Sequence, residues 1–214
     1  MATYDELHQR ILRALNDASG KTYDDSLVYD GVVAAHSAIL PWVPKQAMST
    51  LTTTGSDGIS IILPTDLYEV MALYYPDQAV FIPRANLVAF ARRSQDYAND
   101  WIDYPDGQLT LSVEIENEDE LRLYYLAYWP MPANESDSSY VIQVPREAHQ
   151  GMIYYACSHC LVPRAVNSAS IRQFNQRVDS GNPEDNPLKA EAEWMLNRFF
   201  QEMKLMPPYV KVGM

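Results

Sequence analysis

The stretch VPREAHQGMIYYACSHCLV, residues 144–162, decides the fold of this chain. Residues suited to burial recur along it at helical spacing and form one stripe: His149, Met152, Ile153, Ala156 and Cys160. Because proline interrupts a helix interior, we predict one core helix bounded by Pro145 and Pro163. Other helices must then cover its buried face.

The sequence before this stretch predicts an αα-hairpin that can supply such a cover. A first helix covers 4–18 and opens with a capping box made by Thr3 and Glu6. A second helix covers 24–39, and its apolar stripe consists of Val28, Val32, Ala35 and Ile39.

Residues 51–144 predict mostly strands. Strand-forming or alternating apolar residues mark 59–64, 108–115 and 121–128. Turn-like connections separate the later runs, so we expect residues 100–128 to form a three-stranded antiparallel meander.

The remainder of this region predicts loops and short helices. Residues 50–58, TLTTTGSDG, are a polar loop, and residues 129–139 are a Pro- and Ser-rich loop. Two short helical pieces are expected near 65–73 and 84–94.

Two further helices are predicted near the C-terminus. One lies within 167–178, and the last begins at Asn186-Pro187, a favourable N-cap and N1 pair. The last helix has an apolar face of Leu188, Ala192, Met195, Phe199 and Met203.

The order of elements predicts an α+β fold. We expect a helical bundle built from the N-terminal αα-hairpin and the C-terminal helices, residues 1–50 and 145–206. A small antiparallel β region, 51–144, is inserted into it, and residues 207–214 form an extended C-terminal tail.

The two cysteines raise the question of a metal or redox site, because Cys157 and Cys160 have C-x-x-C spacing with His159 between them. On a helix their Cβ atoms are about 5–6 Å apart, whereas a disulfide needs about 3.8 Å. His159 points roughly 100° away from Cys160 around the helix. A structural zinc usually needs four ligands, and the sequence has no second such pair. We therefore predict core cysteines, with no metal and no cofactor.

Charge and motifs narrow the class of function. The chain carries 28 acidic and 16 basic residues, a formal charge of −12, which disfavours tight binding to nucleic acid. It has no G-x-S-x-G, no phosphate-binding loop, no H-E-x-x-H and no G-x-G-x-x-G. No apolar run approaches the roughly 20 residues of a membrane helix. We predict a protein without catalytic residues that is not an enzyme and has no membrane partner.

Two segments are candidate functional sites. The acidic run ENEDE, 116–120, is either a solvated hairpin tip or an acidic rim that faces a negatively charged molecule which must not bind. The tail LMPPYVKVGM, 205–214, is apolar and extended, and its adjacent prolines lower the entropy cost of docking on a partner.

In the order of its elements the chain resembles the head-to-tail adaptor, or connector ring, proteins of tailed bacteriophages, and its plan is closest to the adaptors of short-tailed phages. The resemblance covers nearly the whole chain. Besides the N-terminal hairpin, it rests on these segments: LPTDLYEV (63–70), LRLYYLAYWPMP (121–132), VPREAHQGMIYYACSHCLV (144–162) and KAEAEWMLNRFF (189–200) with the tail that follows.

The resemblance implies a ring of about twelve copies under the phage portal protein. Such a ring joins the capsid to the tail, nozzle or stopper proteins, and genomic DNA passes through its channel without specific binding. It implies a place in the virion neck, with assembly in the host cytoplasm. The tail would contact the portal through Met206, Pro207, Pro208, Tyr209, Val210, Lys211 and Val212. Candidates for lining the channel are Glu116, Glu118, Asp119 and Glu120.

Three alternatives remain open on the sequence. The chain is another neck or tail-completion component of a virion, or a carbohydrate- or ligand-binding module that uses its tyrosines. The third is a metal-dependent enzyme centred on Cys157, His159 and Cys160.

Overall fold

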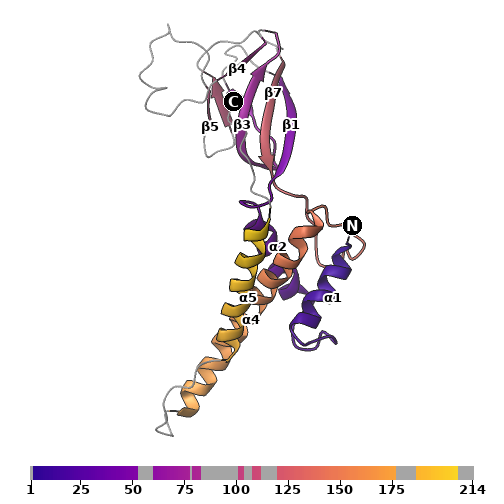
Figure 1. The fold of residues 1–214 in the computed structure, drawn as a ribbon, viewed down its shortest axis with the longest axis vertical. Coiled ribbons are helices and arrows are strands. Elements are labelled where there is room, and N and C mark those ends of the chain that lie inside the picture. Colours follow the sequence, from indigo (N-terminus) through magenta and orange to yellow (C-terminus); the bar gives the residue numbers. More distant parts are fainter. Residues whose placement is uncertain are drawn as a thin grey trace. The chain divides into compact units, whose positions relative to one another are not determined.

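The computed structural model describes residues 2–52, 60–77, 79–82, 101–103, 108–111, 120–176 and 187–206 (Figure 1). The chain has the predicted α+β character, with helices and small antiparallel sheets. Its contacts divide it into two units. The helical unit comprises residues 1–44 and 129–214, and the β unit comprises residues 45–128.

The N-terminal hairpin is confirmed, with α1 at Tyr4–Ala14 and α2 at Asp25–Ile39. The predicted capping box is present, because Glu6 N donates to Thr3 Oγ1 and Thr3 N donates to Glu6 Oε2, each at 3.2 Å. All four residues of the predicted α2 stripe are buried.

Helix α1 ends before the predicted limit at residue 18. Asn16 adopts a left-handed φ of 57°, which takes the chain out of the helix. The Asp17 carboxylate then accepts backbone N–H groups of Lys21, Thr22 and Tyr23 at 3.2, 2.7 and 2.9 Å. These bonds fix the loop that leads to α2.

Residues 144–162, with which the sequence analysis began, form a short 3₁₀ turn, η1 (Arg146–Ala148), and the start of α4 (His149–Gln176). The predicted stripe along α4 is buried throughout. The prediction that Pro163 ends the helix is wrong, because α4 continues through it for a total of 28 residues. The separate helix predicted within 167–178 is the second half of α4, as far as residue 176.

Packing on both sides of Pro163 explains why the helix continues. A proline in a helix interior costs about 3 kcal/mol. Leu161 and Ala165, which flank Pro163, are both buried. One turn earlier, Ser158 Oγ donates to Ala192 O of α5 (Pro187–Leu205) at 2.9 Å. Burial and contacts along α4 therefore offset the lost hydrogen bond.

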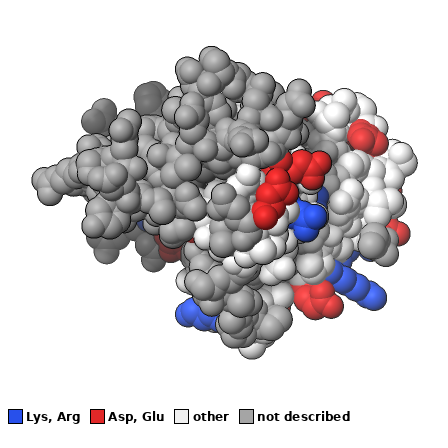
Figure 2. Space-filling view, turned by 90° about the horizontal axis from the view of Figure 1, so that it is seen from above, with Lys and Arg blue, Asp and Glu red and all other residues white. Residues whose placement is uncertain are grey.

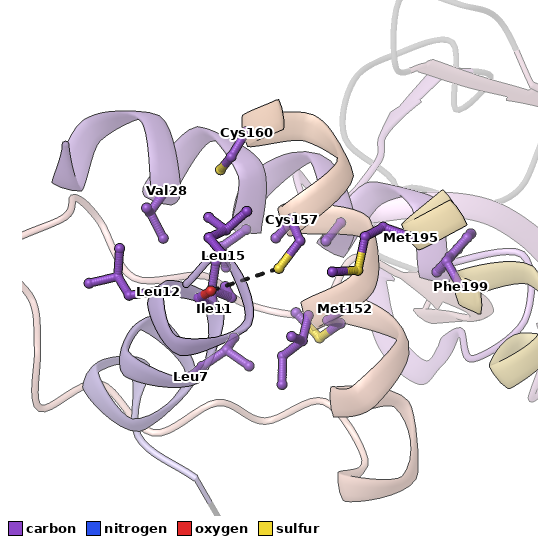
Figure 3. Packing of buried hydrophobic residues seen from close by; sticks show 14 of the residues in the cluster. Leu7, Ile11, Leu12, Leu15, Val28, Met152, Cys157, Cys160, Met195 and Phe199 are labelled. Atoms are coloured by element: carbon purple, nitrogen blue, oxygen red, sulfur yellow. Dashed lines mark hydrogen bonds between the residues drawn. The ribbon is translucent and has the colours of Figure 1, made fainter. Parts of the chain in front are cut away.

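Helix α5 presents its predicted apolar face to the core of the helical unit. Ala192, Met195, Phe199 and Met203 are buried, and Leu188 is half-buried against them. Figure 3 shows the resulting core, in which α4 side chains lie between those of α1 and those of α5.

The residues of the helical unit that come just before and just after the β unit are linked by a hydrogen bond. Trp129 Nε1 donates to the backbone carbonyl of Val43 at 2.8 Å. The segments before and after the inserted region are thus anchored to each other.

The β unit contains a four-stranded antiparallel sheet in the order β1-β7-β3-β4. One face of this sheet carries the buried residues Leu73, Leu121 and Leu123. The strands are β1 (Lys45–Thr52), β7 (Glu120–Ala127), β3 (Leu67–Tyr75) and β4 (Val80–Ile82).

A second sheet in the order β2-β6-β5 shares this core through the fully buried Leu109. Its strands are β2 (Ser60–Ile62), β6 (Gln108–Leu111) and β5 (Trp101–Asp103).

Three predictions for this region are wrong. The predicted meander fails because β7 pairs with β1 and β3 and not with β6. Strand β1 was missed, since its last residues fall in the predicted polar loop at 50–58. Residues 67–75 form strand β3 and not a helix. Register shifts along β3 interrupt its alternation, so its pattern did not indicate a strand. The helical piece predicted near 84–94 lies outside the described residues.

Candidate assembly surfaces

Cys157 and Cys160 are fully buried core residues, as predicted. The Cys157 thiol points at the Ile11 carbonyl of α1, 3.8 Å away (Figure 3). The Cys160 thiol points at the Leu27 carbonyl of α2, 3.6 Å away. Burial raises the pKa of both thiols to about 12. Since the thiolate is the nucleophile and the metal ligand, both groups are held in their unreactive form.

Within the described residues, no three His, Cys, Asp or Glu side chains lie close enough together to hold a metal ion.

The first candidate surface is an apolar groove between α4 and α5, with a volume of ≈ 420 Å³. Val162 and Val166 of α4 are 50% and 63% exposed along it. An ion pair between Lys189 Nζ and Glu193 Oε1, 3.7 Å long, lies on its α5 side. We call this surface the α4–α5 groove, and its lining residues are Ser158, Val162, Ala165, Val166, Lys189, Ala192, Glu193 and Leu196.

Helix α5 exposes further apolar side chains outside the groove. Trp194, Phe200 and Leu205 are 50%, 43% and 79% exposed. The Trp194 ring lies edge-on to Tyr154, with 6.3 Å between centroids, and the Arg198 guanidinium lies 5.2 Å from its centroid. These contacts hold Trp194 in place at the surface.

The second candidate surface is the outer face of the four-stranded sheet, which we call the aromatic face: Met48, Tyr74, Phe81 and Tyr124. Met48 is opposite Tyr124, and Tyr74 is opposite Phe81. The Phe81 ring lies 5.0 Å from Tyr74 and 6.4 Å from Tyr124 between centroids. Met48 and Phe81 are 57% and 47% exposed, so the face is open.

The sequence could not identify the aromatic face. Tyr124 and Tyr125 point to opposite faces of the sheet, as their alternation indicated, and the buried Tyr125 donates its hydroxyl to Asp66 at 3.0 Å. Met48 and Phe81 join Tyr124 only through pairing between strands distant in the sequence.

Most of the predicted site residues lie outside the described residues. This applies to residues 207–212 of the tail and to Glu116, Glu118 and Asp119. Met206 is half-buried against the helical core, and its N–H donates to the Met203 carbonyl at 3.2 Å. Glu120 is exposed at the start of β7, opposite Thr52 of β1. Both assignments stay predictions.

Charged side chains of both signs are interspersed on the face seen in Figure 2. Among the residues coloured there, Lys and Arg side chains are scattered and form no continuous basic surface.

In the described part of the chain, no helix is both long and apolar enough to cross a membrane.

Contiguous exposed apolar side chains on a folded protein mark candidate contact surfaces for other proteins or for ligands. The α4–α5 groove and the aromatic face are two such candidates. The family model described as SU10 adaptor protein matches residues 2–192. The chain belongs to this family of phage head-to-tail adaptors. No curated protein matches it.

Proposed function

We propose that this phage adaptor forms a ring of about twelve copies beneath the portal, in the neck of the virion. The ring joins the capsid to the tail or nozzle proteins, and its channel carries the genome during packaging, retention and ejection. The observation that carries the proposal is the family match over residues 2–192, which spans both the helical unit and the β unit. We assign the protein a structural role and no catalytic one.

The charge of the chain supports a channel through which DNA slides. A formal charge of −12 repels the phosphate backbone, so DNA passes such a surface without adhering. The acidic run at 116–120 is the candidate for the channel wall.

The α4–α5 groove supports a subunit-to-subunit contact in the ring. Its apolar lining gains free energy when a neighbouring surface removes it from water, at about 25 cal/mol per Å². An aspartate at Val166 or Leu196 places a charge in that lining and should prevent ring assembly on the portal. Val33→Asp is the matched control, because Val33 is exposed on α2 and does not line the groove. If the groove variants assemble as well as the control, the subunit contact lies elsewhere.

The C-terminal segment is the proposed portal contact. Deleting residues 206–214 should abolish binding to purified portal rings, while the circular dichroism spectrum keeps its helical signal. A second test variant, with Tyr209, Val210 and Val212 replaced by serine, keeps the length of the tail but removes these apolar side chains and should also lose portal binding. Unchanged portal affinity in both variants would show that the tail is not the contact.

The open aromatic face favours a second candidate, in which the chain is a neighbouring neck or tail-completion component whose β unit holds the next protein. Electron cryo-microscopy of the assembled neck, with the position of this chain assigned, separates the two. The same face keeps carbohydrate binding open, because sugars stack on aromatic rings. A glycan array with wild type and Phe81→Ser tests that possibility.

A further inference from the structure

A pocket between α1 and the start of α4 gathers positive charge in a strongly acidic chain. It has a volume of ≈ 450 Å³, and its lining includes Arg10 and Arg13 of α1 and Arg146 of η1. We call it the arginine pocket. Arg10 and Arg13 share one side of α1 with Glu6, because residues three and four apart lie on the same helix face.

The three guanidinium groups are not neutralised within the described residues. Among the lining residues that the structure describes, Glu6 is the only carboxylate, and one of its oxygens accepts the backbone N–H of Thr3 in the capping box. Arg10 Nη2 donates to the neutral side chain of Gln150 at 2.9 Å, which holds Arg10 against α4. In the described part of the chain, no carboxylate lies within ion-pair distance of Arg13 or Arg146.

The walls of the pocket are fixed by contacts with the protein core. His149 Nε2 lies 2.9 Å from the Val144 carbonyl, and the His149 side chain is buried. The fully buried side chains of Leu7 and Ile11 pack helix α1 against the core of the helical unit. The arginines therefore project from a framework that is formed in advance, which lowers the cost of binding.

We propose that the arginine pocket binds an acidic peptide segment of a partner protein. Guanidinium groups pair with carboxylates through two parallel hydrogen bonds, and three of them around one cavity can hold two neighbouring acidic side chains. The volume is in the range of sites for small ligands. A DNA duplex presents its phosphates on a convex surface, and a concave pocket on a chain with a charge of −12 meets few of them.

Binding of a fluorescein-labelled glutamate-rich peptide, followed by fluorescence anisotropy, tests the proposal. The wild-type protein should bind this peptide, with an affinity that falls as salt is raised, and should not bind its glutamine-matched counterpart. The double variant Arg13→Gln, Arg146→Gln should bind the peptide at least about tenfold more weakly, because two charge-assisted contacts are lost. Arg122→Gln is the control: Arg122 is exposed on β7, and its loss should leave the affinity unchanged.

Substitution of these arginines should not disturb the fold, since all three side chains are exposed. The thermal midpoint of each variant verifies this directly. The double variant Arg13→Lys, Arg146→Lys keeps the positive charges but loses the two parallel hydrogen bonds that a guanidinium group makes to a carboxylate. Its affinity should therefore lie between those of the wild type and the glutamine variant.

Three results would overturn the proposal. The first is equal binding of the peptide by the wild type and the glutamine variant. The second is arginine-dependent binding of duplex DNA that is tighter than that of the peptide, which would assign the pocket to nucleic acid. The third is arginine-dependent self-association in analytical ultracentrifugation, which would mean that a second copy of this chain fills the pocket.

Discussion

Two phenylalanines, Phe199 in the helical unit and Phe81 in the β unit, have opposite surroundings. In the helical unit Phe199 is 2% exposed and packs edge-on against Tyr155, with 5.0 Å between ring centroids. In the β unit Phe81 is 47% exposed, although Tyr74 and Tyr124 lie within 6.4 Å of it. The first arrangement fills a core, and the second leaves an apolar surface facing outward.

This difference predicts which property, stability or binding, a substitution at each place should change. Substitutions in the helical core should reduce the free energy of unfolding, whereas substitutions on the aromatic face should reduce the affinity for a partner with little effect on folding. Four measurements, ordered by expected effect, test this difference.

The largest effect is expected for Phe199→Ala. Removing a fully buried aromatic ring leaves a cavity and should cost about 3–5 kcal/mol of unfolding free energy. Urea unfolding followed by circular dichroism measures it. Phe200→Ala, on the next residue with 43% exposure, should cost less than about 1 kcal/mol. Similar losses for the two variants would contradict the assignment of Phe199 to the core.

Acid should destabilise the helical unit through His36. Burial lowers the pKa of His36 to about 4, below its value of 6.5 in the unfolded chain. The folded state therefore resists protonation, and as pH falls from about 6.5 to about 4 the unfolded state alone takes up the proton. Stability should fall by up to about 3 kcal/mol over this window.

Denaturant titrations at several pH values test this effect, with His36→Leu as the variant that removes the titrating group. Its unfolding free energy should depend less on pH, and the remaining slope includes His149, whose pKa burial also lowers. All four histidines of the chain lie outside residues 45–128, so this source of acid sensitivity belongs to the helical unit. An unchanged slope in the His36→Leu variant would contradict the assignment.

An intermediate effect is expected where α2 and α4 approach closely. A Cβ atom at Gly31 would lie 3.1 Å from the Ala156 carbonyl oxygen and 3.3 Å from Cys160 Sγ. Because helix backbone cannot move aside as a side chain does, Gly31→Val should cost about 1–3 kcal/mol.

Gly151→Ala is the comparison for Gly31→Val, at a position where the added Cβ meets a side chain and not helix backbone. Its Cβ would meet the terminal methyl group of Met203, which is flexible and can rotate away. The better helix propensity of alanine, about 1 kcal/mol, should offset the adjustment and leave stability nearly unchanged. Calorimetry of both variants decides whether Gly31 is needed for the close approach of the helices.

The smallest effect on folding is expected on the aromatic face. Phe81→Ser should change the unfolding free energy by less than about 1 kcal/mol, since about half of the side chain is already in water. Leu123→Ala, on the buried face of the same sheet, is the comparison and should cost about 2–5 kcal/mol. If Phe81→Ser were as destabilising as Leu123→Ala, the aromatic face would be part of a core.

The helical unit was largely predictable from the sequence because its signals are local. A capping box lies within four residues, and a stripe at helical spacing identifies the buried side of one helix without reference to its neighbours. Thus the buried face of α2, the stripe of α4 and the face of α5 were all predicted correctly. The end of α1 and the passage of α4 through Pro163 were the exceptions, and the second depends on contacts with α5.

The β unit and the surfaces were less predictable because they depend on distant partners. Pairing of β7 with β1 joins residues 45–52 to residues 120–127, and no local pattern encodes that choice. The arginine pocket was missed for the same reason: Arg146 is far from Arg10 and Arg13 in the sequence and joins them only when α4 packs on α1. The prediction for the tail at 207–214 rests on its adjacent prolines, its apolar side chains and the family resemblance, and it stays a prediction.

The insertion of the β unit between α2 and α4 has a consequence for the order of folding during synthesis. Residues 1–44 emerge from the ribosome first, yet the core that buries α1 and α2 is completed by α4 and α5, more than a hundred residues later. The β unit is one continuous segment and can fold as soon as it has emerged. The apolar stripes of the N-terminal hairpin therefore stay uncovered until α4 and α5 have been synthesised, and uncovered apolar surface is prone to aggregate.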